Sequence, residues 1–203
     1  MTKIFISTNI PDPNSPMLQA YINYLDDKEI EVFLTSKLQF KPLNGNCKII
    51  TTNYLKKKWH FLLYPLVFVY TLVALTLTYI KGSKHRNYIK KNYLYDLIFS
   101  TKYLTNHLSL NIFHLTAMLK FKPDLVICVC AGSTLAARIY KRITSKPFFY
   151  SMYEIFPDQI EKEFFYRRFL KIRIEYKACK NANAIIIPFC RQFERLLRMR
   201  YKL

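Results

Sequence analysis

A carboxylate in the second half of the chain is the strongest candidate for catalysis. Glu154 follows an aromatic residue, Tyr153, and precedes an apolar wall at residues 155–157. An apolar environment raises the pKa of a carboxyl group, which suits a general base that takes a proton from a hydroxyl. We therefore predict a catalytic role for Glu154 and a ligand contact for Tyr153. The alternative is structural: Glu154 caps the following segment or pairs with Arg167 or Arg168.

Two short polar segments are candidates for ligand binding. Gly132 and Ser133 stand at the expected start of a helix, where backbone N–H groups favour an anion. Asn14 and Ser15 lie between two prolines in the loop that follows the first expected strand. Helix capping explains both pairs as well, so a binding role and a capping role remain open. We predict ligand contacts for all four residues.

The elements that position these residues form a predicted βαβ unit. An apolar run at residues 125–130 is typical of a buried strand, residues 135–142 read as a helix, and a second strand at 147–151 ends just before Glu154. Open α/β sheets bind ligands at the carboxyl ends of their strands. We expect an α/β fold, with a Rossmann-like parallel sheet flanked by helices and the site at that edge.

Several segments also carry a resemblance to a known family. Residues 122–124 read Lys-Pro-Asp before one strand, and residues 153–158 read Tyr-Glu-Ile-Phe-Pro-Asp after the next. With residues 3–7 and 178–188, they resemble the N-terminal domain of family 4 glycosyltransferases of GT-B architecture. That family has His-Asp or His-Glu, an apolar pair and Pro at the second place, so Tyr153 stands where its histidine is found. The resemblance covers residues 1–197.

The resemblance implies one half of a two-domain enzyme. Residues 1–197 correspond to the acceptor-side domain, and residues 198–203 to the start of an interdomain linker. The family's nucleotide-sugar site lies on a second domain, so we expect a truncated gene or a donor-binding half on a separate subunit. The implied activity is hexosyl transfer from a nucleotide-sugar to a lipid-linked or surface-polysaccharide acceptor. It would require the donor-binding half. We expect no cofactor on the acceptor-side half. The alternative is a non-catalytic basic membrane-docking or assembly module, or an inactive remnant.

The composition of the chain points to a polyanionic partner. The chain has 203 residues and 51% hydrophobic residues, enough for one sizeable core. Its 32 lysines and arginines against 13 acidic residues give a net charge of +19. Such a charge favours a phospholipid surface, a lipid-linked phosphate or a nucleic acid. We see no nucleic-acid-binding motif, and we therefore expect no nucleic-acid partner.

The cysteines and histidines do not predict a metal site. Five cysteines lack paired C-x-x-C spacing, and four histidines are scattered along the chain. Cys128 and Cys130 are two residues apart on an expected strand, so they should share one face and pack as small hydrophobic residues. The sequence begins with a strand pattern rather than a basic and then apolar leader. We therefore expect no metal, no secretory signal and a reducing cytosol.

Residues 59–80 form an uncharged, strongly apolar segment with lysines on both sides. As a helix it would be about 33 Å long, close to the hydrocarbon thickness of a bilayer. A transmembrane span would separate the strands before it from those after it, although the resemblance places them in one sheet. Interfacial or re-entrant insertion, a true span and a buried core helix remain the alternatives. Pro65 would mark an early kink or the first turn of this helix.

The next segment, residues 84–120, has apolar residues at helical spacing with lysines between them. This pattern predicts a helix that packs on the sheet, or one that adds to a membrane-docking surface, and different faces can do both. We expect a protein attached to the cytoplasmic face of the cell membrane, with its phospholipid surface as a partner.

Overall fold

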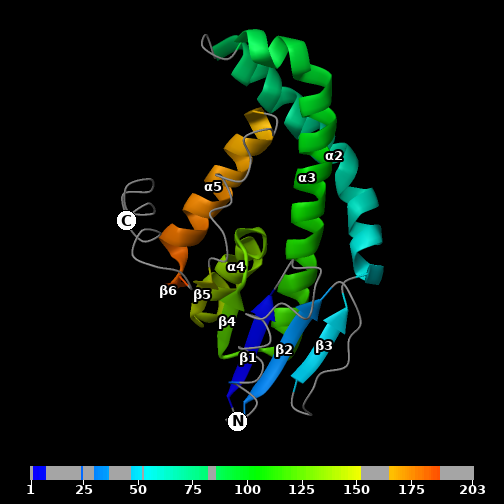
Figure 1. Cartoon of the computed structure of the whole chain (residues 1–203). Helices are drawn as coiled ribbons and strands as arrows, with labels where there is room; N and C mark the ends of the chain where they lie inside the picture. The colour runs from blue at the N-terminus through cyan, green and yellow to red at the C-terminus, as the bar shows by residue number, and fades with distance from the viewer. Residues whose placement is uncertain are drawn as a thin grey trace.

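The computed structural model has a single parallel sheet with helices packed on it (Figure 1). It describes residues 2–7, 24, 30–36, 47–51, 53–81, 86–151 and 165–187. The sheet has six strands in the order β3-β2-β1-β4-β5-β6. The strands are β1 Lys3–Ser7, β2 Glu31–Ser36, β3 Cys47–Thr51, β4 Leu125–Cys128, β5 Phe148–Ser151 and β6 Ala184–Ile186. The helices are α2 Asn53–Lys81, α3 Arg86–Phe121, the short 3₁₀ turn η1 Ala131–Ser133, α4 Thr134–Thr144 and α5 Phe165–Asn181.

This strand order confirms the predicted α/β Rossmann-like fold. All neighbouring strands run parallel, and Phe5 pairs with Phe33 of β2 on one side and Val126 of β4 on the other. The chain moves outward from β1 to β3 and then returns to place β4 beside β1. Doubly wound sheets of this order bind ligands where the direction reverses. The reversal therefore lies between β1 and β4.

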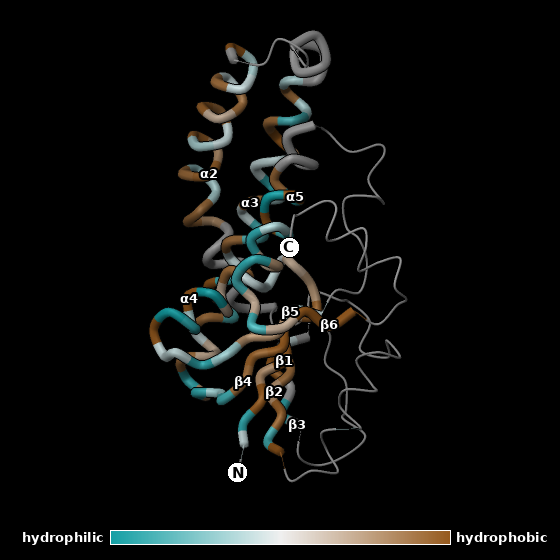
Figure 2. The backbone as a smooth tube through the Cα atoms, turned by 90° about the vertical axis from the view of Figure 1, so that its left-hand side faces the viewer, coloured by the Kyte–Doolittle hydropathy of each residue, from teal (hydrophilic) through white to brown (hydrophobic). Residues whose placement is uncertain are grey.

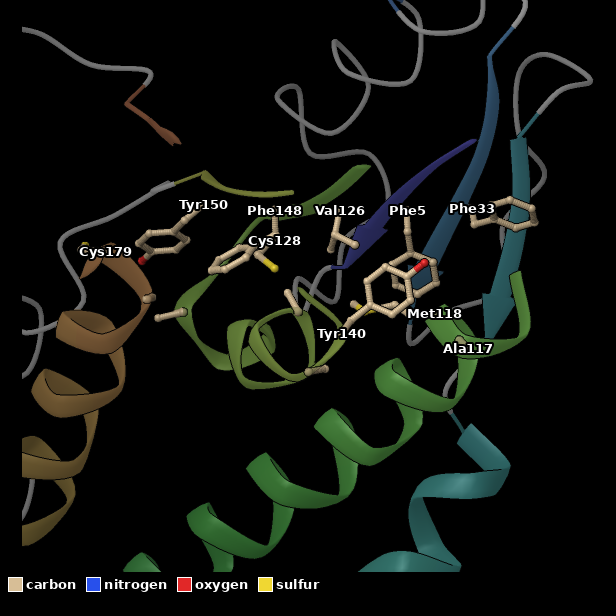
Figure 3. Packing of buried hydrophobic residues seen from close by; sticks show 14 residues of the cluster. Phe5, Phe33, Ala117, Met118, Val126, Cys128, Tyr140, Phe148, Tyr150 and Cys179 are labelled. Carbon is tan, nitrogen blue, oxygen red and sulfur yellow. The ribbon is translucent and has the colours of Figure 1, made fainter. Parts of the chain in front are cut away.

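The centres of strands β1, β2 and β4 are apolar because both faces of the sheet are buried there. Phe5, Phe33 and Val126 point to one face, where α3, α4 and α5 cover them (Figure 3). The alternating residues of the same strands, with Val129 just after β4, form a second buried cluster on the other face: Ile4, Ile6, Val32, Leu34, Ile127 and Val129. The two-residue period of the sequence thus separates two apolar layers.

Helix α3 is much longer than the sheet is deep. Its 36 residues extend about 54 Å, whereas a five-residue strand such as β1 extends about 17 Å. Lys122 has a positive φ of 50° and precedes Pro123, which ends α3 and turns the chain into β4. Because α3 ends at the amino edge of the sheet and runs opposite to the strands, its first part extends past the carboxyl edge.

Helix α2 packs along this projecting part of α3, and together they form an arm (Figure 1). We define the arm as α2 and residues 86–110 of α3. Helix α5 lies against it, and Leu75, Leu97 and Leu170 from the three helices form a buried cluster separate from the two sheet clusters. The arm therefore has a small apolar core of its own.

The structure corrects two sequence-based expectations. Helix α2 begins at Asn53, so Pro65 lies inside the helix rather than in its first turn; the three lysines at 56–58 are good helix formers and extend the helix ahead of the apolar run. Strand β4 ends at Cys128, which leaves the half-buried Cys130 outside the strand. The two cysteines therefore do not share a strand face, because the chain has already turned into η1.

Candidate functional site

The candidate site lies at the carboxyl edge where β1 and β4 end side by side. Ser7 ends β1 and Cys128 ends β4, and the two residues pair in register. The Val129 N–H donates to the Ser7 carbonyl at 2.9 Å, which holds the strand ends together as the chain leaves the sheet. The turn η1 and helix α4 follow directly. This is the edge at which the sequence predicted a ligand.

An amide from the arm holds the turn at this edge. Asn111 of α3 donates from Nδ2 to the Gly132 carbonyl at 2.7 Å, and its Oδ1 accepts from the Ala136 N–H at 2.8 Å. The N-cap residue Ser133 makes no side-chain cap, so Asn111 satisfies an N–H group in the first turn of α4 from outside the helix. Sequence reasoning missed Asn111, because no local sequence pattern reports a bond to residues more than twenty positions away.

The hydroxyls of the turn are hydrogen-bonded to the protein itself. Ser133 is fully buried, and its Oγ donates to the Cys130 carbonyl at 3.0 Å, with the Ser7 carbonyl at 3.4 Å. Thr134 Oγ1 donates to the Ala131 carbonyl at 2.8 Å. The structure thus brings Gly132 and Ser133 to the carboxyl edge. The predicted contact of Ser133 with a ligand would involve its backbone, because its side chain is already bonded.

The other predicted site residues lie outside the described part of the chain. Asn14 and Ser15 follow β1, and Tyr153 and Glu154 follow β5. Since β1 and β5 are parallel members of one sheet, both strands end at the same edge as β4. The roles predicted for these four residues remain predictions.

Two buried histidines lie on α3 between the arm and the sheet. Burial lowers the pKa of His107 to about 4 and, with a smaller effect from His107, the pKa of His114 to about 3. Neither ring nitrogen of His114 has a hydrogen-bond partner among the described residues, and its ring meets Phe5 edge-on at 6.4 Å between centroids. Both imidazoles are therefore neutral at pH 7 and pack as core groups.

Two buried thiols, those of Cys128 and Cys179, are unreactive because of their environment. Burial raises the pKa of Cys128 to about 12, against smaller opposing effects of the Ser7 and Ser133 hydroxyls. Burial likewise raises the pKa of Cys179 to about 12. Since the thiolate is the nucleophile and metal ligand, neither residue serves as one at neutral pH. Within the described ranges, no three His, Cys, Asp or Glu side chains form a group that could hold a metal ion.

The Lys-Pro-Asp motif lies at the opposite, amino edge of the sheet. Asp124 pairs with Lys146 at 2.8 Å and accepts the Lys3 backbone N–H at 3.1 Å, and these bonds, led by the Lys146 bond, lower the pKa of its carboxyl group. The Tyr140 hydroxyl donates to the Pro123 carbonyl at 2.9 Å. The motif therefore joins β1, β4 and α4, and its role in the described structure is architectural.

No protein-family model matches this chain, and no curated protein has a matching sequence.

Proposed function

We propose that the chain is the acceptor-side half of a glycosyltransferase, which transfers a sugar from a nucleotide-sugar to a lipid-linked or polysaccharide acceptor when a donor-binding domain completes it. The observation that supports this most is the reversal of strand order between β1 and β4, with the Gly132 turn at its carboxyl edge. Doubly wound sheets bind ligands at such a reversal of strand order. The segment that contains Glu154 follows β5 at the same edge.

In this proposal the residues at the edge have distinct roles. Glu154 accepts the proton of the attacking acceptor hydroxyl as the new glycosidic bond forms and the nucleotide leaves with the electron pair of the old one. The backbone at Gly132 and Ser133 contacts the acceptor, as do Asn14, Ser15 and Tyr153. The nucleotide-sugar is a substrate held by the other domain, and no cofactor is required of this half.

Transfer assays with the purified chain test the proposal. The chain is mixed with anionic lipid vesicles, a panel of radiolabelled nucleotide-sugars and the protein encoded directly downstream. We expect transfer only when the second protein is present, and a loss of about 100-fold or more in Glu154→Gln, the usual scale for a general base. Asp158→Asn, a carboxylate four residues further on, is the matched control. Vesicle binding without transfer in any combination would contradict the catalytic proposal.

A second candidate, a non-catalytic membrane-docking module, is favoured by a different observation. The most apolar part of α2, Phe61–Ile80, is long enough to enter a bilayer and only 17% of it is buried. This low burial supports insertion over the buried core helix among the sequence-based alternatives. Both candidate functions involve a phospholipid surface at the cytoplasmic face of the cell membrane, and the transfer assay separates them.

A further inference from the structure

The two helices of the arm expose many large apolar side chains. On α2, the side chains of Leu66, Val73 and Leu77 recur at helical spacing, and Leu66 is 72% exposed. We call the complete set the arm face, and its members are Phe61, Leu62, Leu66, Val69, Tyr70, Val73, Leu77 and Ile80 of α2 with Leu94, Tyr95, Ile98 and Phe99 of α3. Isolated exposed apolar residues are ordinary, but so many at helical spacing on one helix are typical of an interaction site. Figure 2 shows hydrophobic segments recurring along α2 beyond the sheet.

The inside of the same arm holds polar and charged side chains beside its Leu75, Leu97 and Leu170 cluster. Helix α3 buries Asp96, Ser100 and Thr105 completely, and α5 buries Lys171 and Glu175 against the same region. A bundle in water has the reverse arrangement, with apolar residues inside and charged residues outside. Helices in contact with lipid turn their ionisable residues toward the interior of the bundle. The arm thus exposes apolar side chains and buries ionisable ones, as helices in contact with lipid do.

Three threonine hydroxyls of α2 are hydrogen-bonded to carbonyls of the same helix. Thr71 donates to the Val67 carbonyl at 2.7 Å, and Thr78 donates to the Ala74 carbonyl at 2.7 Å. Thr76 donates to the carbonyl four residues earlier at 2.8 Å and lies 3.0 Å from the Tyr93 hydroxyl of α3. A hydroxyl group that donates to a carbonyl of its own helix does not require a water molecule as a partner. Such bonds therefore make a helix face compatible with an apolar surrounding.

The charge of the chain selects among possible occupants of this face. Lysines at 56–58 precede the face, and a basic segment at 81–91 follows it, within a chain of net charge +19. Each end of the face would attract the phosphates of anionic lipids. A second copy of the chain would bring equally basic ends to the same place, and like charges oppose that association.

We propose that the arm face docks lengthwise on an anionic phospholipid bilayer, with α2 against the acyl chains and the basic segments at both ends on the lipid phosphates. Helix α5 and the polar interior then lie on the side away from the bilayer. This inference rests on the membrane partner of the proposed function and is independent of the transferase activity. It names the surface that docks.

Vesicle sedimentation with the full chain tests the proposal. Vesicles of phosphatidylcholine alone are compared with vesicles that also contain phosphatidylglycerol. We expect stronger binding to the anionic vesicles and a loss of about 100-fold in the double variant Leu66→Glu/Val73→Glu, since two apolar side chains lose their burial. Ile143→Glu on α4 is the matched control, because Ile143 is 61% exposed but lies away from the arm. Circular dichroism checks that both variants are folded.

The outcomes separate this inference from the proposed function. Absence of vesicle binding by the wild type would overturn the membrane partner and the inference together. Binding that survives Leu66→Glu/Val73→Glu, or falls equally in Ile143→Glu, would overturn the arm face alone. A dimer in light scattering that the double variant abolishes, without vesicle binding, would assign the face to a second copy instead.

A fluorescence probe is already present. Trp59 is the single tryptophan of the chain, and its position is in α2 beside the arm face. We expect anionic vesicles with brominated acyl chains to quench its emission, with little quenching in the double variant. Unquenched emission from vesicle-bound protein would contradict lengthwise docking, because the end of α2 that carries Trp59 would then not lie at the bilayer surface.

Discussion

The sheet and the arm are built from similarly apolar sequences, yet they place their apolar residues oppositely. The sheet region buries its largest aromatic side chains, among them Phe5, Phe33 and Phe148. The arm exposes large apolar side chains and buries charged ones, as Leu66 and Asp96 illustrate. Hydrophobic content alone therefore does not distinguish a protein core from a docking surface. The distribution of polar residues on the opposite side of each element does.

The largest expected effect is a difference in stability between a variant of the sheet and a variant of the arm. Phe5→Ala removes a fully buried ring from the sheet cluster, and we expect a loss of about 4 kcal/mol in the free energy of unfolding. Val73→Ala on the arm face should change it by less than about 0.5 kcal/mol, because Val73 is already exposed. Urea denaturation of both variants measures the difference. A comparable loss in Val73→Ala would show that the arm face is internal packing.

A pH effect of intermediate size arises where the two regions meet. His107 and His114 have folded pKa values of about 4 and about 3, below the ordinary value of 6.5. As the pH falls below 6.5, the unfolded chain therefore takes up protons first, and stability is lost. Between pH 7 and 5 we expect a loss of about 2 kcal/mol for each histidine.

Denaturation midpoints at several pH values measure this loss. The window above pH 5 avoids most carboxylate titration. His114→Leu should remove about half of the pH dependence, and His107→Leu a similar part. An unchanged slope in both variants would contradict burial of the neutral rings.

The smallest predicted effect concerns the connection between arm and edge. Asn111→Ala leaves the Gly132 carbonyl and the Ala136 N–H without their partner, and we expect a loss of about 2 kcal/mol. Asn111→Asp should lose less, since a carboxylate still accepts from Ala136. Asn106→Ala, a half-buried amide on the same helix, is the control and should be nearly neutral. Equal losses of stability at both positions would show that the bonds of Asn111 to Gly132 and Ala136 add no particular stability.

The local patterns of the sequence predicted the sheet well. The apolar run from residue 125 and the strand at 147–151 both lie where expected, because strands buried on both faces show as short, uninterrupted apolar segments. The end of β4 was placed too late, since Val129 is buried although it is outside the strand. At Val129 the chain is thus still buried, although the strand has already ended.

The sequence predicted the arm only in part. The uncharged apolar run indicated α2 and helical spacing indicated α3, but neither pattern showed that α3 continues from the arm to the sheet as one helix. The role of Asn111 was also missed, because its partners are more than twenty residues away and no local pattern reports such a bond. Long-range hydrogen bonds are set by the fold and become visible only with it.

The continuity of α3 also fixes a rotational relationship. One uninterrupted helix carries Leu94, Tyr95 and Ile98 of the arm face and, further along, Asn111 at the Gly132 turn. Each residue of an α-helix turns the chain by about 100°, so inserting a single residue between Phe99 and Asn111 would rotate the arm face by that angle relative to the sheet. In the proposed docking, the number of residues between Phe99 and Asn111 therefore sets how the carboxyl edge of the sheet is oriented relative to the bilayer.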